Sequence, residues 1–328
     1  MDNPLENMAI KSEGTAFLKH HLRDIKCLHC NNLIEFTNGA SIDCPNCNSH
    51  YPVINGIPVL INENESIFSF KDFTDQKNLF FDISRSGALK ARVSSLLPSL
   101  SFNKISRQNF QYLSALFTNN KKYSVLILGG SIEGQGITEF LRLPNLHIVE
   151  SDVSFGPRTQ VILDAHHIPF INESFDCVIA QAVLEHVVDP TQCVSEMYRI
   201  LKPGGIVYSE IPFMQQVHGG AYDFTRFSMS GHRRLFRRFE QMKAGALAGP
   251  GTTMGWSYTY FLISLFGFTP ALKLFIKTFA RLTAFWLKYF DHLTMHLSRT
   301  VDGASVTYFI GSKSDKTFTD KELISYYK

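Results

Sequence analysis

The sequence predicts an α/β protein built on a doubly wound, mostly parallel β-sheet, with a small cysteine-rich unit before it and a helical segment after it. The main observation is a series of short apolar runs that alternate with helical segments from Tyr123 onward. Runs with few charges are typical of strands covered on both faces. Their alternation with helices indicates βαβ units and hence a parallel sheet. The predicted strands are Val125–Leu128, His147–Val149, Val161–Leu163, Cys177–Ala180 and Ile206–Tyr208.

The composition is that of an ordinary globular protein. Of the 328 residues, 45% are hydrophobic and 19% are charged, so a sizeable core is possible. The formal net charge of +3 is too small to indicate a nucleic-acid partner. The first residues are polar and lack a basic segment followed by an apolar run. We therefore expect no signal peptide. The expected location is cytoplasmic, with peripheral attachment to a membrane as a further possibility.

The connections between the predicted strands differ in length. Thr191–Leu201 has the spacing of a helix, with Asp189-Pro190 as its start signal and Gly204-Gly205 as its end signal. The interval from Asp152 to Val161 is too short for a full helix, so a loop or a single turn is expected there.

Composition divides the chain into six predicted segments. Helical spacing at Leu89–Leu97 and Phe110–Phe117 indicates a connecting arm, and Val306–Ile310 alternates like a last strand. The segments are a flexible N-terminus (1–20), the cysteine-rich unit (21–62), the helical arm (63–120), the α/β core (121–248), a hydrophobic helical insertion or lid (249–300), and the final strand with a polar tail (301–328).

Four of the six cysteines form two Cys-x-x-Cys pairs, Cys27 with Cys30 and Cys44 with Cys47. Four thiolates fill the tetrahedral shell of Zn²⁺, so the site is expected to be structural, with no position for a catalytic water. The pairing favours metal binding in a reducing compartment over disulfides. With the following run Tyr51–Ile61, this segment resembles the small zinc-ribbon family that activates tRNA and translation-factor methyltransferases.

A glycine-rich run, Gly129–Gly136, follows the first core strand. Glycines permit a tight turn and a close approach of backbone amides to a ligand at a helix N-terminus. Alone, this run indicates any nucleotide-like ligand, and Asp152 lies at about the distance expected for the ribose of a dinucleotide.

Four further runs follow in order: Asp164–Phe170, Phe175–Ile179, Val183–Pro190 and Arg199–Gly205. Together with the glycine run they resemble the class I S-adenosylmethionine-dependent methyltransferases of the small-molecule type, over roughly residues 123–240. The resemblance implies a Rossmann-like fold and argues against a nicotinamide-dependent oxidoreductase.

The resemblance also implies a cofactor site. The Gly129 loop would face the methionine and ribose, Asp152 would accept the ribose hydroxyls, and Asp164 would accept the adenine amino group. Carboxylates at the ends of adjacent strands would converge there. Two positions depart from the pattern, Ile127 for an acidic residue and Ser131 for a glycine. The expected cofactor residues are Gly129, Gly130, Ser131, Gly134, Asp152, Asp164, Ala165, His166, Ala180 and Gln181.

The loop after the fifth core strand, Ile211–Phe227, is the candidate acceptor side. It resembles a loop of these enzymes often linked with polysaccharide or lipid-linked glycan modification. By that resemblance His218 is the candidate general base, Asp223 its orienting partner and Arg226 an anion contact. In the alternative, Asp223 and Arg226 pair to pin the loop and His218 is solvated. Glu185-His186 is expected to cap and orient a helix.

Two other features have open interpretations. A basic run, expected on a helix, is either a solvated face or a phosphate-binding surface. The uncharged stretch Ala244–Leu272 is either a buried strand with a helical lid, a peripheral membrane contact or a transmembrane helix, though glycines and prolines interrupt it. The basic run comprises His232, Arg233, Arg234, Arg237 and Arg238.

The expected function is S-adenosylmethionine-dependent O- or N-methylation of a small molecule, glycan or lipid-linked sugar, with a structural Zn²⁺. An RNA methyltransferase would suit the ribbon and the basic run, but no aromatic stacking motif supports it. A non-catalytic cofactor-binding or interaction protein is the third hypothesis, and Ile127 and Ser131 motivate it.

Overall fold

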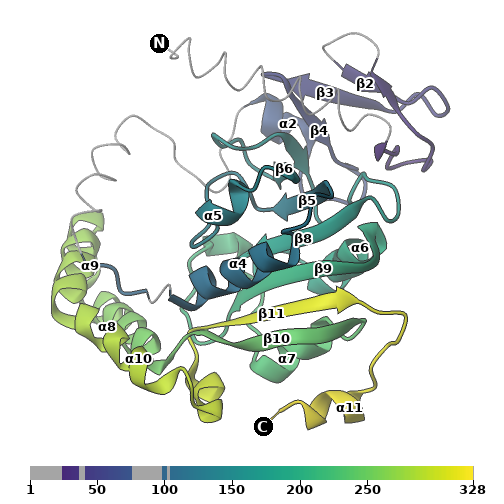
Figure 1. Ribbon diagram of the computed structural model, residues 1–328. Coiled ribbons are helices and arrows are strands. Elements are labelled where there is room, and N and C mark those ends of the chain that lie inside the picture. The colour runs from purple at the N-terminus through teal and green to yellow at the C-terminus, as the bar shows by residue number, and fades with distance from the viewer. Residues whose placement is uncertain (1–23, 37–40, 76–97, 102–103, 328) are drawn as a thin grey trace.

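The computed structural model describes residues 24–36, 41–75, 98–101 and 104–327 (Figure 1). The expected flexible N-terminus and the helical spacing at Leu89–Leu97 lie outside these residues. Within them, one 11-stranded sheet has the order β1-β2-β3-β4-β7-β6-β5-β8-β9-β11-β10.

The centre of the sheet is parallel, as the sequence predicts. Each of the five predicted runs lies within a strand. From β5 the chain steps outward to β6 and β7, then returns to β8 on the other side of β5. This reversal makes a topological switch point between β5 and β8. The strands are β5 (Tyr123–Leu128), β6 (Leu146–Asp152), β7 (Val161–Leu163), β8 (Phe175–Gln181) and β9 (Leu201–Pro212). No helix lies between β6 and β7, which confirms the short second crossover.

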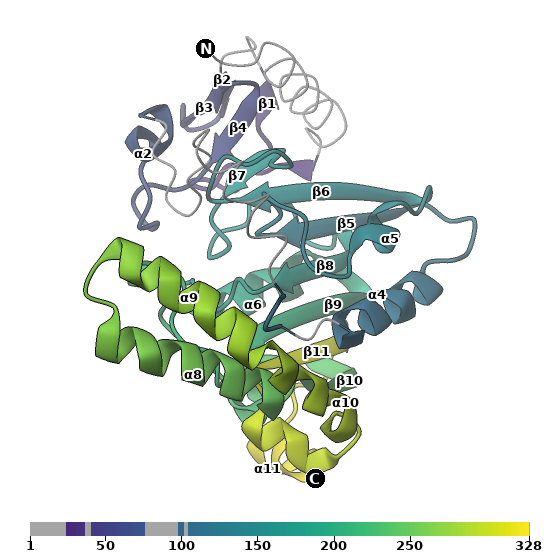
Figure 2. The same ribbon diagram turned by 90° about the vertical axis from the view of Figure 1, so that its left-hand side faces the viewer.

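Helices cover both faces of this sheet (Figure 2). Alternate side chains of β5 point to opposite faces, as the pleat requires. Val125 and Ile127 pack with α4 (Lys104–Leu116) and the single turn α5 (Thr138–Leu141). Leu126 and Leu128 pack in a second cluster with α6 (Pro190–Ile200) and with residues around α7 (Met229–Leu235). Both clusters explain why the core strands are continuously apolar.

Helix α6 starts where the sequence predicts but ends earlier. The Asp189 side chain accepts hydrogen bonds from the backbone N–H groups of Thr191 and Gln192, and Pro190 is the first helical residue. The helix ends at Ile200, and β9 begins at Leu201, whose backbone is already extended. The prediction that Gly204-Gly205 closes the helix is therefore wrong. Gly204 has a φ of +71° in β9, where the added freedom of glycine is used at the irregular start of the strand.

The cysteine-rich unit is continuous with the main sheet. Its strands are β1 (Glu35–Phe36), β2 (Ser41–Asp43), β3 (His50–Ile54) and β4 (Ile57–Leu60), paired antiparallel. An Asn55-Gly56 turn with positive φ at both residues joins β3 to β4, as favoured in tight hairpins. Strand β4 then pairs in parallel with β7. The unit thus covers a sheet edge that would otherwise expose unpaired backbone groups.

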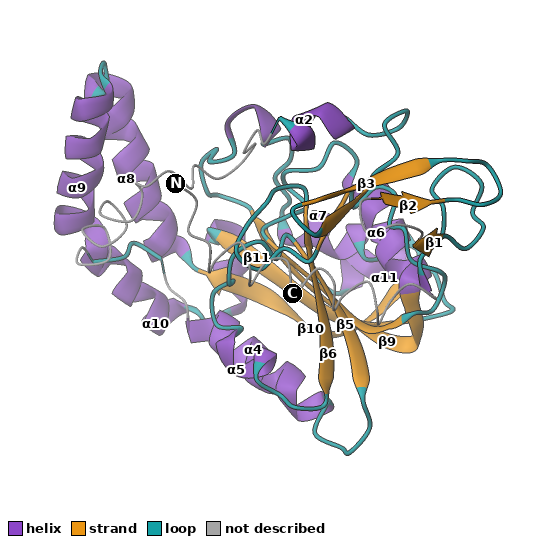
Figure 3. Cartoon of the chain, turned by 90° about the horizontal axis from the view of Figure 1, so that it is seen from above, coloured by secondary structure: helices purple, strands orange, loops and turns teal. Residues whose placement is uncertain are grey.

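The other end of the sheet is antiparallel and carries the helical insertion. Strand β11 (Val306–Lys313) lies between β9 and β10 (Phe239–Ala248) and contains the predicted last strand. The insertion between β10 and β11 begins with α8 (Pro250–Phe266) and α9 (Pro270–Ala284), which stand away from the sheet (Figure 3). The remaining elements are α2 (Phe70–Thr74), η2 (Gly220–Tyr222), η3 (Phe285–Phe290), α10 (Asp291–Thr294), η4 (Ser298–Gly303) and α11 (Asp320–Ser325).

A buried carboxylate anchors the insertion. Asp291 accepts hydrogen bonds from the backbone N–H groups of Gly249, Gly251 and Thr252 at the start of α8. These are the amides that the helix itself leaves without partners. Of the helices that the structure describes, none has both the length and the apolar character needed to span a bilayer.

Candidate cofactor and acceptor site

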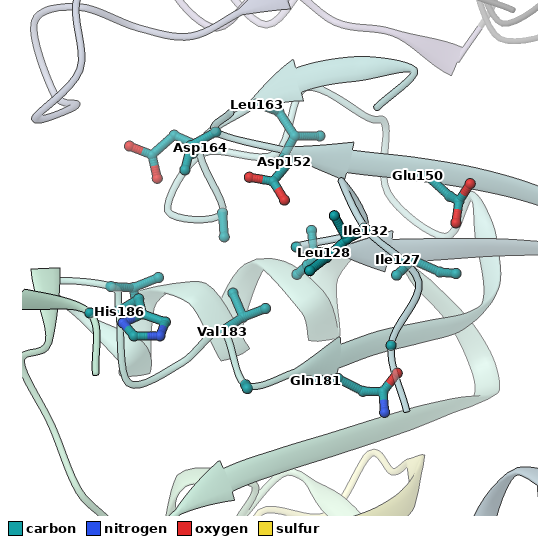
Figure 4. A pocket seen from close by; sticks show the side chains of 18 of the residues that line it. Ile127, Leu128, Ile132, Glu150, Asp152, Leu163, Asp164, Gln181, Val183 and His186 are labelled. Atoms are coloured by element: carbon teal, nitrogen blue, oxygen red, sulfur yellow. The ribbon is translucent and has the colours of Figure 1, made fainter. Parts of the chain in front are cut away.

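A cavity of about 550 Å³ opens where β5, β6, β7 and β8 reach their carboxyl ends (Figure 4). This is the edge at which ligands bind in doubly wound sheets, and the volume lies in the range of small-molecule sites. Its lining combines the glycine loop, the ends of these strands and Ile67 and Phe68, which follow β4.

The structure brings together most of the residues expected to hold a cofactor. Ser131 and Ala180 are fully buried behind the cavity wall instead. The backbone N–H of Ser131 still takes part, since it donates to Asp152 Oδ2 over 3.1 Å. The expected residues that line the cavity are Gly129, Gly130, Gly134, Asp152, Asp164, Ala165, His166 and Gln181.

The glycines of the loop are required by close packing. Gly129 has a φ of +70°, and an added Cβ would lie 2.5 Å from Cγ2 of Val183. A Cβ on Gly134 would overlap the side-chain amide of Gln181. The expected helix N-terminus behind the loop is reduced to the single turn α5, which starts at Thr138. The cavity wall at this place is therefore formed by backbone amides of the loop, and a four-residue helix adds little dipole to it.

Asp152 and Asp164 lie on one side of the cavity, opposite Gln181, Val183 and His186 (Figure 4). Asp152 is buried, and its two oxygens accept from the backbone N–H groups of Ser131 and Ser154. Burial raises the pKa of the Asp152 carboxyl above its usual value. Each oxygen has a second lone pair, so the carboxylate can accept further hydrogen bonds from a ligand.

Asp164 is held by partners from two directions. Its Oδ2 accepts from the Ser66 hydroxyl over 2.5 Å, and its Oδ1 accepts from the backbone N–H of His166 over 3.0 Å. Burial alone would raise the pKa of this carboxyl, but the hydrogen bonds from His166 and Ser66 outweigh it and hold the pKa below its usual value. Asp164 is therefore a fixed anion at the cavity wall.

Several lining residues were not anticipated from the sequence. Glu150 lies two residues before Asp152 on β6, and its Oε1 pairs with Arg158 over 2.8 Å. The two-residue period of a strand could have indicated it, because residues i and i+2 share a face. Ile67 and Phe68 have no local signal, since only the pairing of β4 with β7 brings them to the cavity.

The loop after β9 brings His218 and Gly219 to the cavity. Asp223 accepts hydrogen bonds from the backbone N–H groups of these two residues and forms an ion pair with Arg226. Its Oδ2 lies 3.8 Å from Nδ1 of His218, which is too far for a hydrogen bond. Asp223 therefore lies beside the imidazole without a hydrogen bond to it, and its hydrogen bonds orient the backbone of the loop.

Glu185 does not cap a helix, contrary to expectation, because Asp189 has that role. Its side chain is fully buried, and burial raises the pKa of the carboxyl to about 8. Glu185 Oε1 lies 3.7 Å from Nε2 of His186 and 3.7 Å from Nε2 of His218. Sequence reasoning missed this grouping because His186 and His218 lie 32 positions apart.

The four cysteines of the two pairs lie together in the cysteine-rich unit, which is called the ribbon from here on. Sγ of Cys27 is 3.5 Å from that of Cys47, and Sγ of Cys30 is 3.4 Å from that of Cys44. A tetrahedral Zn²⁺ with bonds of about 2.3 Å needs sulfur atoms roughly 3.8 Å apart, so the spacing fits this ion. Hydrogen bonds from the backbone and then the side chain of Asn32 lower the pKa of the Cys30 thiol to about 6.

The basic run is neither a solvated face nor a phosphate-binding surface throughout. His232 is fully buried between the hydroxyls of Thr307 and Ser209, and burial lowers its pKa to about 3. Arg233 is also buried and donates to backbone carbonyls near the end of α7. The remaining members also have partners: Arg234 pairs with Asp320, Arg237 donates to the Phe318 carbonyl, and Arg238 stacks on Tyr198.

Helix α8 contacts the loop of His218, and in the described part of the chain neither α8 nor α9 lines the cavity. Ser257 accepts a hydrogen bond from the Gln216 side chain, and the Tyr260 hydroxyl donates to the Val217 carbonyl over 2.9 Å. The insertion therefore braces this loop from outside the cavity.

One protein-family model matches part of this chain. Residues 139–209 match the model of a methyltransferase domain. The ubiquinone/menaquinone biosynthesis C-methyltransferase UbiE of Haemophilus ducreyi is 39% identical over 64 residues, which are 20% of this chain and 22% of that protein. The ubiquinone biosynthesis O-methyltransferase of Xanthomonas oryzae pv. oryzae is 37% identical over 70 residues, which are 21% of this chain and 28% of that protein. The chain thus spans less than a third of the length of these relatives.

Among solved structures, phosphoethanolamine N-methyltransferase 2 of Haemonchus contortus aligns with a TM-score of 0.39 at 17% identity, over 63% of this chain and 52% of that one. By its sheet topology the domain that holds the cavity is a Rossmann-like α/β domain, and its residues 139–209 match the methyltransferase domain family.

Proposed function

We propose that the protein is a class I S-adenosylmethionine-dependent methyltransferase. The observation that carries the proposal is the cavity at the switch point, with Asp152 and Asp164 on one wall, in the region that matches a methyltransferase domain. Asp164 is a fixed anion and suits the amino group of adenine. Asp152 has lone pairs for the ribose hydroxyls, and the Gly129 loop leaves room for the rest of the cofactor.

The reaction is an in-line displacement. An oxygen or nitrogen of the acceptor forms a bond to the methyl carbon while the carbon–sulfur bond breaks, and the electron pair stays on sulfur. The acceptor loses a proton to a base. Much of the acceleration in such a reaction comes from holding the two reactants aligned. His218, at the cavity, is the candidate group to face the acceptor, with Asp223 and Arg226 holding its loop.

Calorimetric titration tests the cofactor assignment. Zinc-loaded protein should bind S-adenosylmethionine and S-adenosylhomocysteine, and NAD should give no heat. Binding of NAD alone, or of none of the three to folded protein, would contradict the proposal. Binding of S-adenosylmethionine without methylation of any hydroxyl or amine acceptor would favour a non-catalytic cofactor-binding protein, the alternative that Ile127 motivates.

The ribbon is proposed to act as a built-in activator of the methyltransferase domain, with Zn²⁺ held by Cys27, Cys30, Cys44 and Cys47. Two contacts support this role. Strand β4 completes the edge of the sheet beside β7, and Ser66, shortly after β4, donates a hydrogen bond to Asp164. A metal that orders the ribbon would thereby also position the cofactor site.

The acceptor is proposed to be a small molecule or glycan, with a lipid-linked sugar favoured by the α8–α9 pair. Exposed apolar side chains gather on this pair, among them Phe261, Phe268 and Phe275. Four basic residues and no acidic ones occur between Ala244 and Phe290. Apolar residues combined with positive charge suit the interface of an anionic membrane. RNA is disfavoured, because the basic run is engaged within the protein.

Sedimentation with lipid vesicles tests the membrane contact. The protein should bind vesicles that contain phosphatidylglycerol more strongly than vesicles of phosphatidylcholine alone. Changing Phe268 and Phe275 to serine should reduce binding. Ile324→Ser is the matched control, because Ile324 on α11 is 72% exposed and Phe268 is 81% exposed. Equal binding by both variants and the parent protein would contradict the proposal.

A further inference from the structure

Glu185, His186 and His218 form a cluster of which the proposed methyltransferase function uses His218 alone. One ligand-type atom of each residue lies within 4.8 Å of the others. Both imidazoles line the cavity, so the cluster faces the site where an acceptor would bind. The rings meet edge to face, with centroids 4.9 Å apart.

The carboxylate of Glu185 needs a partner. It is fully buried, and neither of its oxygens has a hydrogen bond within the described part of the chain. An unsatisfied buried carboxylate is costly. A proton would neutralise the charge, but the resulting O–H group would still lack an acceptor. The nearby Arg226 guanidinium attracts the Glu185 charge, but its N–H groups donate to Asp223 and to backbone carbonyls, so it makes no hydrogen bond to Glu185.

The geometry suits a metal ion. Bonds of about 2.0–2.2 Å to nitrogen and oxygen place neighbouring ligand atoms roughly 3–4 Å apart. The 3.7 Å separations from Glu185 Oε1 to the two Nε2 atoms lie in this range. His186 Nδ1 is 2.7 Å from the Tyr222 carbonyl, so this nitrogen carries the proton and Nε2 is the nitrogen that would coordinate an ion. Asp223 holds the backbone at His218 and fixes the third ligand.

We propose that Glu185, His186 and His218 bind a divalent transition-metal cation at the acceptor end of the cavity. Two imidazoles and one carboxylate are a ligand set for ions such as Zn²⁺, Fe²⁺ and Mn²⁺, and three protein ligands leave positions open. The open positions face the cavity that His186 and His218 line.

A substrate class follows, and this part rests on the proposed methyltransferase function. A cation at this place would coordinate an acceptor oxygen and lower the pKa of its hydroxyl. The hydroxyl proton would pass to solvent, the oxygen would bond to the methyl carbon, and the sulfur would keep the electron pair of the broken bond. The acceptor is then a phenol, an enediol or a sugar hydroxyl and not an amine. His218 is a ligand in this scheme and not the general base.

Electron paramagnetic resonance with Mn²⁺ tests the metal site directly. Mn²⁺ prefers oxygen and nitrogen ligands, so it should leave a zinc-loaded cysteine site undisturbed. The protein should bind one Mn²⁺. Glu185→Gln and His218→Gln should each weaken binding by more than the roughly 10- to 100-fold cost of losing an outer hydrogen-bond partner. The matched control is His50→Gln, since His50 pairs with Asp43 over 2.5 Å on the surface of the ribbon.

The outcomes separate the two proposals. Absence of bound Mn²⁺, or equal binding by the parent protein and both ligand variants, overturns the metal site. A specific loss in Glu185→Gln and His218→Gln, but not in His50→Gln, supports it. Circular dichroism should show a cooperative thermal transition in the ligand variants as in the parent protein, which shows that they are folded. Mn²⁺ binding without any cofactor binding would refute the methyltransferase proposal and leave the metal site standing.

Discussion

Replacing Asp164 by alanine should weaken the binding of S-adenosylhomocysteine. Hydrogen bonds from His166 and Ser66 keep this carboxylate ionised and fixed at the cavity wall. A hydrogen bond to a charged group contributes about 1.5–3 kcal/mol. Since about 1.4 kcal/mol changes an equilibrium constant tenfold, the dissociation constant should rise roughly 10- to 150-fold. Isothermal titration calorimetry at one pH and salt concentration measures this change.

The matched control for Asp164 is Asp176→Ala. Asp176 is 9% exposed and Asp164 is 3% exposed, so both are buried carboxylates of the same sheet. Asp176 lies at the start of β8, where it accepts from the backbone of Ser124 and from Lys202, whereas the cavity lies at the end of β8. Asp176→Ala should lower stability and leave affinity unchanged. The reasoning is refuted if Asp164→Ala binds within twofold of the parent protein, or if both variants lose affinity equally.

Three further predictions concern stability and the two binding sites. Burial lowers the pKa of His232 to about 3 in the folded protein, while the pKa in the unfolded chain is about 6.5. Between these two values the unfolded chain binds the extra proton, so the free energy of unfolding falls as the pH decreases from about 6.5 toward about 3. His232→Gln should therefore reduce the slope of unfolding free energy between pH 6 and 4 by up to about 1.4 kcal/mol per pH unit in urea titrations, and an unchanged slope contradicts this. Cys44→Ser should lower the zinc content measured by atomic absorption and weaken cofactor binding. Cys193→Ser is the control, because Cys193 is a buried cysteine of α6, and it should leave both quantities unchanged. Full zinc content in Cys44→Ser would disprove the zinc ribbon. Gly129→Ala should lower the melting temperature, because φ at this residue is +70° and the new Cβ meets Val183. Adding Val183→Ala should recover only the part of the loss that comes from the steric clash. A thermal melt that shows no loss in Gly129→Ala rejects this account.

The pattern of residues along the chain was sufficient to predict those features that depend on neighbouring residues alone. Strands buried on both faces must be apolar along their whole length, so the five core strands could be found from their residues. Carboxylates at the ends of neighbouring parallel strands must lie at one edge, which placed Asp152 and Asp164 on the same cavity. The Cys-x-x-Cys spacing likewise predicted that the four thiols meet.

The failures concern residues whose environment depends on distant chain segments. His232 and Arg233 look like a charged surface helix, but α7 packs against β11 and the segment before α11, which bury both side chains. Gly204-Gly205 looks like a helix stop, but extended backbone at Leu201 has already ended α6. The single turn at α5 is too short to supply the expected helix dipole.

The sequence by itself determined the five parallel core strands, the grouping of the four cysteines and the edge at which a cofactor would bind, because apolar strand runs, Cys-x-x-Cys spacing and βαβ alternation can be read along the chain. Only the tertiary structure decided what completes that site. Ser66 reaches Asp164 across 98 positions because β4 pairs with β7. Glu185 meets His218 because the loop after β9 folds back over the end of β8. Such contacts depend on chain topology, and residue patterns along the chain do not encode them.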